Sequence, residues 1–492
     1  MAADRNRYGC RCRLRVRGGS VPGGRRGEGR RRARDSPGRA PGRRGLRAAP
    51  LSARARRPLF DVRASDIVVP DIHRGGNVAR AFTFIHTADL HLDAPFKGID
   101  AGDARVRDAL VDSTYAALDR IVALAITRRV DFVAIAGDAY NSKDKSLRAQ
   151  LRFRTAMERL AAENIAVYVA QGNHDPADGF SARLEMPGNV HYFSTAAVET
   201  FELRDEKDDM LCAIHGRGYA TAAIKTNLAK GFARGGESTA IGVLHANVGG
   251  VPDYEPYAPC SLDDLKAADM DYWALGHIHK PTVLADAPPI RYCGSPQGLN
   301  PKEDGEHGCW VVTMDGGRVI ESEFVETAAV RWGRDVVDIA DLDTVDGVRS
   351  ALGEACMRAR HGAGDSPMVM RIDVVGRGEA HAALSHGTDF DDLVTELRDE
   401  QLSLSPWLWL DRVRNLTRPA LDVDFLLGVE DFTGDLARLA RDLIADPQAA
   451  ATFVDQAVAS IDGAFGRRER DPVDLIERAR DECLDRLAGG EA

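Results

Sequence analysis

Short apolar runs alternate with amphipathic stretches along residues 82–328. The runs have the length of strands and lie at 82–87, 132–136, 166–170, 211–214, 241–245, 272–275, 291–293 and 309–314. Between the first two runs, residues 104–128 carry apolar side chains at helical spacing, among them Leu118, Ile121 and Val122. This alternation predicts an α/β domain over residues 81–327.

The pattern changes after residue 328. Residues 344–360 read as a helix and 367–375 as a strand, which predicts a smaller, capping-like α+β accessory domain over 328–417. Residues 418–492 read as charged helices at 436–443, 449–461 and 473–487, separated by Gly and Pro. These helices either pack among themselves or form a docking element for a partner protein.

Residues 1–80 show no apolar periodicity and contain 22 Arg, no Lys and 6 acidic residues. Such a segment cannot bury enough apolar surface to offset its chain entropy, so we expect it to be disordered. Three interpretations stay open: a basic arm that binds nucleic acid, an Arg-rich transit peptide, or GC-rich upstream sequence read from a start codon placed too early. We favour the third, because the absence of Lys fits biased coding better than selection for positive charge.

Composition narrows the class of protein. The chain has 492 residues, of which 44% are hydrophobic, and no apolar run reaches the roughly 18 residues that a membrane span needs. The N-terminus lacks the apolar core of a secretory signal. We therefore expect a cytoplasmic protein that does not contact membrane. The 8 cysteines form no C-x-x-C pair, which predicts reduced packing residues rather than a zinc or disulfide framework.

The charge outside the first 80 residues is acidic, with 43 basic and 69 acidic residues. A body of this charge cannot attract nucleic acid through its overall field. Any phosphate binding must therefore come from bound metal ions and from local basic residues.

Five short segments carry the candidate chemistry, and each follows a predicted strand. They read T-A-D-L-H at 87–91, A-G-D-A-Y-N at 136–141, Q-G-N-H-D-P at 171–176, L-H-A-N at 244–247 and L-G-H-I-H-K-P at 275–281. Each motif alone is weak, because a single His or Asp at a strand end is usually a satisfied polar residue. In this order, and all at strand ends, they predict a two-metal centre. Its ligands would be Asp89, His91, Asp138, Asn173, His245, His277 and His279.

Two adjacent divalent ions repel each other unless an anionic ligand lies between them, and Asp138 suits that position. A mixture of oxygen ligands and imidazoles fits Mn, Fe or Zn rather than Mg. Extended backbone would point both residues of D-x-H, and of H-x-H, toward one site. Glycines 137, 172 and 276 would let the chain turn sharply as it leaves each strand.

His174 follows a predicted ligand without being needed as one. We expect it to be the catalytic residue, which contacts a phosphoryl oxygen and helps to protonate the leaving oxygen. The alternative is a structural histidine within the loop. Asp175 would orient His174 or cap the next turn, and the other histidines, His86 among them, match no ligand spacing.

The five motifs resemble the calcineurin-like metallophosphoesterase superfamily, and the match covers about 82–315. The resemblance implies a four-layer α-β-β-α sandwich. It also implies one metal held by Asp89, His91, Asp138 and His279, and another held by Asp138, Asn173, His245 and His277.

Within the superfamily, F-T-F-I-H-T-A-D-L-H-L-D, G-N-H-D, Y-C-G-S-P-Q-G and G-E-H-G-C are similar to the DNA repair exonuclease branch, the SbcD-like nuclease subunits. The segment S-P-W-L-W-L-D-R-V-R-N-L-T-R-P is similar to the YhaO type. This resemblance implies a Mn-dependent nuclease that cleaves DNA phosphodiesters with a metal-bound hydroxide and partners an SMC-like coiled-coil ATPase through C-terminal helices. A homodimer stays open. Where some members have a second histidine, this chain has Asn141, which cannot transfer a proton.

Rival functions differ in what the motifs allow. A Ser/Thr phosphatase would show G-D-x-x-D-R-G, and a purple acid phosphatase would place Tyr three residues after the bridging Asp, where this chain has Asn141. A small-molecule or cyclic-nucleotide phosphodiesterase remains the main alternative, because the metal motif does not name a substrate. A non-catalytic subunit of a repair complex is the other, although such a protein should have lost part of the ligand set.

Overall fold

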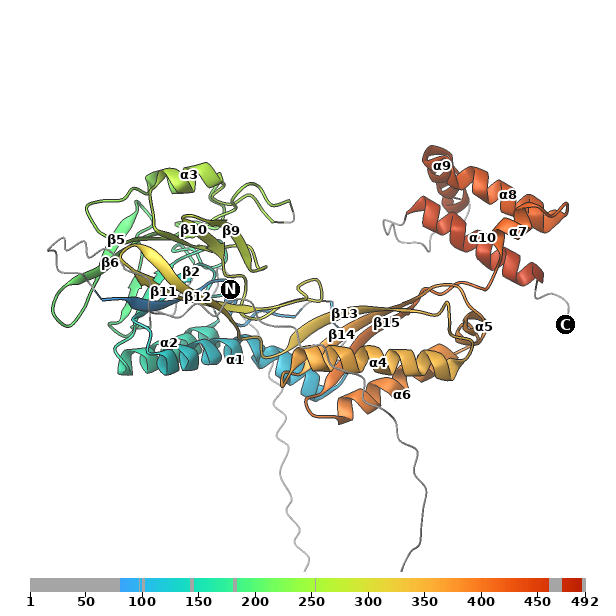
Figure 1. Cartoon of the computed structure of the whole chain (residues 1–492), viewed down its shortest axis with the longest axis horizontal. Helices are drawn as coiled ribbons and strands as arrows, with labels where there is room; N and C mark the ends of the chain where they lie inside the picture. The colour runs from blue at the N-terminus through green and yellow to red at the C-terminus, as the bar shows by residue number, and fades with distance from the viewer. Residues whose placement is uncertain are drawn as a thin grey trace, which may run out of the picture. The chain divides into compact units, whose positions relative to one another are not determined.

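The computed structural model describes residues 80–96, 98–99, 102–141, 146–179, 184–252, 254–459 and 471–488. The prediction for the Arg-rich segment 1–80 therefore lies, except for Arg80, outside the described residues. Figure 1 shows the arrangement of the elements.

The first sheet contains the strands that precede three of the five motifs. Its order is β12 (Arg318–Glu326), β11 (Gly308–Asp315), β1 (Phe82–Thr87), β2 (Phe132–Ala136), β3 (Ala166–Ala170) and β4 (Val190–Tyr192). Strands β1 to β4 pair in parallel, whereas β11 runs antiparallel to β1 and to β12. The carboxyl ends of β1, β2 and β3 therefore meet at one edge of the sheet.

The second sheet contains the strands that precede the other two motifs. Its order is β5 (Glu199–Arg204), β6 (Met210–Arg217), β7 (Ala240–His245), β8 (Tyr272–Gly276), β10 (Pro289–Tyr292) and β9 (Thr282–Asp286). Strands β6, β7, β8 and β10 are parallel. The ends of β7 and β8 thus lie side by side.

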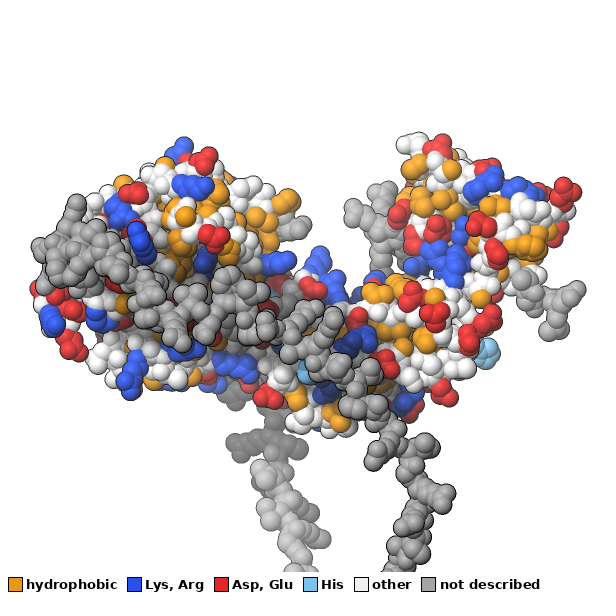
Figure 2. Space-filling view, in the orientation of Figure 1, with side chains coloured by type: hydrophobic (Ala, Val, Ile, Leu, Met, Phe, Trp, Pro, Cys, Tyr) orange, Lys and Arg blue, Asp and Glu red, His pale blue; other side chains and the backbone are white. Residues whose placement is uncertain are grey.

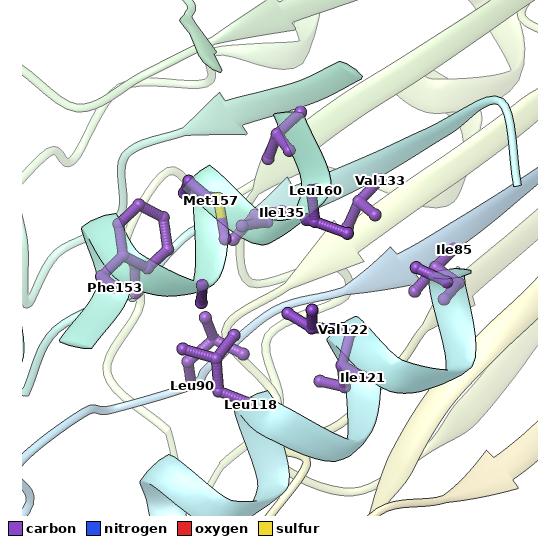
Figure 3. Packing of buried hydrophobic residues seen from close by; sticks show 14 of the residues in the cluster. Ile85, Leu90, Leu118, Ile121, Val122, Val133, Ile135, Phe153, Met157 and Leu160 are labelled. Carbon is purple, nitrogen blue, oxygen red and sulfur yellow. The ribbon is translucent and has the colours of Figure 1, made fainter. Parts of the chain in front are cut away.

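The two sheets and their helices form four layers. Helices α1 (Ala104–Arg128) and α2 (Leu147–Ala162) cover the outer face of the first sheet, where Ile121, Phe153 and Leu160 pack on strand residues (Figure 3). Aromatic side chains fill the space between the sheets, with Phe84 and Phe132 stacked 4.7 Å apart. The outer face of the second sheet is covered more thinly, by α3 (Leu262–Ala267), the short 3-10 helix η1 (Ala229–Gly231) and loops. The predicted four-layer sandwich is confirmed.

A third, three-stranded sheet follows. We call β13 (Arg331–Asp338), β14 (Met368–Val375) and β15 (Leu408–Asn415) the small sheet; its strands are all parallel. Helices α4 (Val345–Ala363), α5 (Ala380–Leu384) and α6 (Asp389–Ser403) pack on one face of it. On the other face Trp332 and Trp409 pack in one apolar cluster with Val106 and Leu110 of α1.

Four helices complete the described chain: α7 (Val423–Leu427), α8 (Phe432–Ile444), α9 (Pro447–Ala459) and α10 (Pro472–Ala488). The predicted α+β stretch and C-terminal helices are thus present. The boundaries at 327/328 and 417/418 stay predictions, because side chains make contacts across both. Among the described residues, no helix is long and apolar enough to cross a membrane.

Most predicted elements match the structure within two or three residues, and the bounds of β1, β2, β3 and α1 agree at both ends. Helix α1 begins after Asp103, whose side chain accepts a hydrogen bond from the Arg105 amide, and it ends at Arg128, followed by the cap residue Arg129 in the left-handed region. Strands with half-exposed residues, such as β9 and β12, were not predicted. The predicted packing role of the cysteines is confirmed for Cys212, Cys260, Cys293, Cys309 and Cys356, which are free and buried.

Candidate metal centre

Each of the five motifs lies at the carboxyl end of a strand in one of the two sheets. The segments after β1 and β2 continue to pair beyond the sheet, because the Asp89 amide donates to the Gly137 carbonyl and the His91 amide to the Asp138 carbonyl, both at 3.0 Å. The first two motifs are therefore fixed to each other by backbone hydrogen bonds.

Four of the seven predicted ligands have a left-handed backbone. The φ angles are 51° at Asp89, 42° at His91, 53° at Asp138 and 103° at His277. The expectation that extended alternation explains D-x-H and H-x-H is therefore wrong. The side chains converge because the chain turns tightly at these residues, a strain that is typical of functional sites.

Two glycines make this convergence sterically feasible. Gly137 has φ of +100°, and a Cβ there would lie 2.2 Å from Nδ1 of His245. A Cβ on Gly172 would lie 2.2 Å from Oδ1 of Asp138. Gly137 permits a turn as predicted, whereas Gly172 is needed for close approach of two loops.

The first group of ligands surrounds Nε2 of His91. This atom lies 3.1 Å from Nε2 of His279 and 3.9 Å from Oδ1 of Asp89, which is also 3.9 Å from Nε2 of His279. The Asp89 carboxylate is held in place by the His277 amide, which donates to its Oδ2 at 2.9 Å.

Asp138 lies between this group and the next. Its Oδ1 accepts a hydrogen bond from the His174 amide at 2.8 Å. Its Oδ2 lies 3.7 Å from Nε2 of His91 and 3.4 Å from Nε2 of His245. One carboxylate oxygen therefore faces a member of each predicted ligand set.

The second group contains Asn173, His245 and His277. Nε2 of His245 lies 3.0 Å from Oδ1 of Asn173, and the rings of His245 and His277 are 5.1 Å apart. Nδ1 of His245 donates to the Ala136 carbonyl at 2.9 Å, which leaves Nε2 free to accept. Nε2 of His277 donates to the Glu255 carbonyl at 2.8 Å, so its Nδ1 is the nitrogen left for a ligand.

Asn247, in the fourth motif, organises the loop that presents this carbonyl. Its Oδ1 accepts from the Val251 amide at 2.8 Å, and its Nδ2 contacts the Tyr254 and Glu255 carbonyls at 3.3 Å. Within L-H-A-N, the sequence predicted a role for the histidine alone. The role of Asn247 was missed, because a hydrogen bond to a carbonyl several residues away leaves no residue pattern.

Burial and neighbouring charges shift the pKa values of these groups. Burial raises the pKa of Asp89 to about 6 and lowers that of His277 to about 4. Burial also opposes the charged form of His245, but the Asp138 carboxylate outweighs it and raises the pKa of His245 to about 9. A proton on His245 has to leave before Nε2 can bind a metal, so metal affinity should increase as the pH rises toward 9.

His174 is exposed and close to the first group. A ring nitrogen of His174 lies within 4.8 Å of ligand atoms of His91 and Asp138. Its Nδ1 donates to the Asn141 carbonyl at 2.7 Å, which directs Nε2 to any substrate contact. Asn141 thus acts through its backbone. The buried Asp175 accepts from the Gly172 and Ala139 amides, so its carboxylate joins two ligand loops.

A cavity of about 1140 Å³ borders the centre at His279. Lys280 and Lys302 lie at it, together with the ring of Tyr254, whose hydroxyl accepts from the His279 amide at 3.2 Å. Arg217, another basic residue near the motifs, instead donates to the Thr195 and Ala196 carbonyls.

The donor set fits divalent metal ions. Two ligand atoms that are each about 2.1 Å from one ion lie roughly 3 to 4 Å apart, which is the range seen around His91 and Asp138. Among the described residues, three groups of His and Asp bring one ligand atom from each member within 4.8 Å of the others: Asp89, His91 and His279; His91, Asp138 and His174; and Asp89, Asp138 and His245. His277 belongs to none of them, and Asn173 joins through its contact with His245.

Two family models match the chain. Calcineurin-like phosphoesterase matches residues 82–281, and the middle domain of metallophosphoesterase YhaO matches 332–418, which spans the small sheet. An uncharacterized metallophosphoesterase YhaO of Bacillus subtilis is 32% identical over 72% of this chain and 86% of its own length.

More distant relatives carry names from DNA repair. The DNA double-strand break repair protein Mre11 of Thermoplasma acidophilum is 29% identical over 43% of this chain, and the SbcD component of the nuclease SbcCD of Bacillus subtilis is 22% identical over 45%. The matches span 55% and 63% of those two proteins, respectively.

Proposed function

Because the chain belongs to the YhaO family of calcineurin-like metallophosphoesterases, we propose that it is a two-metal phosphodiesterase that acts on DNA as a nuclease. The position of Asp138 carries this proposal. Its Oδ2 lies within 3.7 Å of Nε2 of both His91 and His245, as a carboxylate shared by two ions requires.

The seven ligands would hold the two ions as the sequence predicts, with Mn preferred and Fe or Zn as alternatives. Bound divalent ions supply Lewis acidity toward a phosphoryl oxygen and lower the pKa of water. Water attacks phosphorus and releases a proton to solvent, and the bond from phosphorus to the leaving oxygen breaks. His174 gives the proton at Nε2 to that oxygen, while the Asn141 carbonyl fixes its ring through Nδ1.

Two observations favour DNA as the substrate. Relatives named Mre11 and SbcCD align with 43% and 45% of this chain, respectively. The cavity beside His279 also offers two lysines and an aromatic ring, which suit the phosphates and bases of a nucleic-acid end, next to the acidic Glu303, Asp304 and Glu306.

The C-terminal helices support binding of a partner protein. Phe425 of α7 and Phe432 of α8 are each 69% exposed, and hydrophobic side chains are visible on this region in Figure 2. Aromatic residues are enriched at protein–protein interfaces. The partner that we propose is a long coiled-coil ATPase of the SMC type.

The first test is hydrolysis of end-labelled linear DNA with Mn, run beside bis-p-nitrophenyl phosphate. Wild-type protein should degrade the DNA. The His174→Ala protein should bind the same number of ions and lose turnover by roughly 10²- to 10⁴-fold, because it lacks the acid for the leaving oxygen. Asp138→Asn should instead lose at least one ion, as measured by calorimetry.

The outcomes separate the candidate functions. Cleavage of the small diester alone, even with the ATPase added, would favour a small-molecule or cyclic-nucleotide phosphodiesterase. Protein that binds no metal and cleaves neither substrate would indicate a non-catalytic subunit.

A further inference from the structure

Glu303 contacts the metal centre although none of the five motifs contains it. Its Oε1 lies 3.0 Å from Nδ1 of His279, and its side chain is 15% exposed. A carboxylate that accepts Nδ1–H fixes the tautomer of an imidazole and leaves Nε2 as the ligand nitrogen. In His279, Nε2 is the atom that faces His91.

The loop that carries Glu303 holds this carboxylate firmly. The Leu299 amide donates to its Oε2 at 2.7 Å and the Asn300 side chain to its Oε1 at 2.6 Å. His307 contacts the Glu303 carbonyl at 3.1 Å and the Ser295 carbonyl at 2.9 Å. Residues 295–307, which we call the Glu303 loop, thus include parts of Y-C-G-S-P-Q-G and G-E-H-G-C.

The small sheet in turn holds the Glu303 loop. Trp332 of β13 is buried and donates from Nε1 to the Gly298 carbonyl at 2.8 Å. Arg334, two residues further along β13, donates from Nε and Nη2 to the Pro301 carbonyl at 2.9 and 2.7 Å. A Cβ on Gly298 would lie 2.6 Å from Cδ1 of Trp332, so the loop and the strand are in close contact.

We propose that Glu303 is a positioning residue for His279, and that Trp332 and Arg334 of the small sheet keep it in place. This inference rests on the proposed function, in which His279 is a metal ligand. It assigns the small sheet a part in the metal centre, at the ion that Asp89, His91, Asp138 and His279 would bind.

Calorimetric titration of the full chain with Mn tests this. Glu303→Gln keeps the size of the side chain and removes its charge. It should lower the affinity for one of the two ions by about 10- to 100-fold and leave the affinity for the other unchanged. The matched control is Glu306→Gln, because Glu306 is exposed in the same loop and lines the same cavity. It should bind both ions as the wild type does.

A second pair of variants tests the link to the small sheet. Trp332→Phe removes the hydrogen bond to Gly298 and should lower, by several-fold, the affinity for the ion that Glu303→Gln also weakens. Trp409 lies in the same apolar cluster, but its Nε1 has no hydrogen-bond partner. Trp409→Phe should therefore leave the affinity for both ions unchanged.

Equal loss of both ions in Glu303→Gln, with an unfolding temperature well below that of Glu306→Gln, would indicate a merely structural role and overturn the inference. Two ions bound with wild-type affinity in Glu303→Gln would also overturn it while the proposed function stands. A wild-type protein that binds no Mn would instead remove the proposed function, and the inference with it.

Discussion

At the residue scale, strain and hydrogen bonding oppose each other at the predicted ligands. A non-glycine residue with a left-handed backbone costs on the order of 1 to 3 kcal/mol, and Asp89, Asp138 and His277 each have one. Local hydrogen bonds offset this cost, for example from the Asp89 amide to Gly137 and from the His277 amide to Asp89. The site therefore depends on neighbours that are not ligands.

His86 shows how a histidine close to the ligands serves the fold instead. It is fully buried in β1, and its ring contacts the Tyr272 hydroxyl at 3.0 Å and the Leu275 carbonyl at 3.1 Å, so it joins the two sheets. Burial lowers the pKa of His86 to about 3. The ring thus stays neutral in the folded protein at a pH where the unfolded chain binds a proton.

This pKa predicts a pH-dependent loss of stability. The stability that neutral His86 contributes to the folded protein is fully present above its unfolded pKa of 6.5. It is lost as the pH falls toward 3. From pH 7 to 5.5, His86 should cost about 1 kcal/mol of the free energy of unfolding. Urea unfolding with metal removed by a chelator is the measurement. Between pH 7 and 5.5, the free energy of unfolding should fall by about 1 kcal/mol less in His86→Gln than in the wild type. An equal slope in both proteins would contradict the prediction.

At the scale of elements, the segments after the strands matter as much as the strands. The loop after β3 approaches the end of β2 so closely that Gly172 has no room for a side chain beside Asp138. The amides of Gly172 and Ala139 both donate to Asp175, which locks the two loops together.

Gly172→Ala should therefore displace the Asp138 carboxylate and reduce metal affinity by at least tenfold, because ligand geometry is lost. The control is Gly188→Ala, since a Cβ on Gly188 would meet nothing within 4 Å. Mn titration of both proteins provides the measurement. Wild-type affinity in Gly172→Ala would show that the loops can separate at no cost.

At the scale of the whole described chain, α10 is joined to the small-sheet region by a buried carboxylate. Asp481 of α10 has a side chain that is 2% exposed, and it pairs with Arg377 at 2.5 Å, Arg418 at 3.5 Å and Arg480 at 2.9 Å. Asp481 is buried, whereas Arg377 and Arg418 are partly exposed, so removal of the carboxylate leaves uncompensated charge and costs more than loss of a surface pair.

Asp481→Asn should lower the free energy of unfolding by about 3 kcal/mol. Glu482→Gln, which breaks an exposed pair with Arg486 on the same helix, should cost less than about 1 kcal/mol. Denaturant unfolding of the two variants makes the comparison. Similar small losses in both would indicate that α10 is held by apolar packing alone.

Partner binding is predicted at the same scale. Phe432→Ser should weaken binding of a coiled-coil ATPase by tenfold or more, because an exposed aromatic residue is lost from the proposed surface. Ile320→Ser on β12, where Ile320 is 60% exposed, is the matched control. Sedimentation or calorimetry with the purified ATPase measures both. Equal affinity of the two variants would place the surface elsewhere.

The amino-acid sequence by itself determined the central strands and the residues of the candidate centre. Strands β1, β2 and β3 are short apolar runs whose bounds follow from the adjoining polar motifs, and the helical period of α1 is local too. These features depend on residues that are neighbours along the chain, so a pattern can reveal them. Edge strands such as β12 escaped, because their residues are largely exposed and give no apolar run.

Only the tertiary structure decided which atoms meet. Nδ1 of His245 is hydrogen-bonded to a carbonyl that is 109 residues away in the sequence, and Nδ1 of His279 contacts Glu303 in a later loop. Each contact determines which ring nitrogen stays free. The left-handed turns at Asp89 and His277 likewise exist because neighbouring strands hold them. Such contacts depend on the packing of two sheets, and packing leaves no period in the sequence.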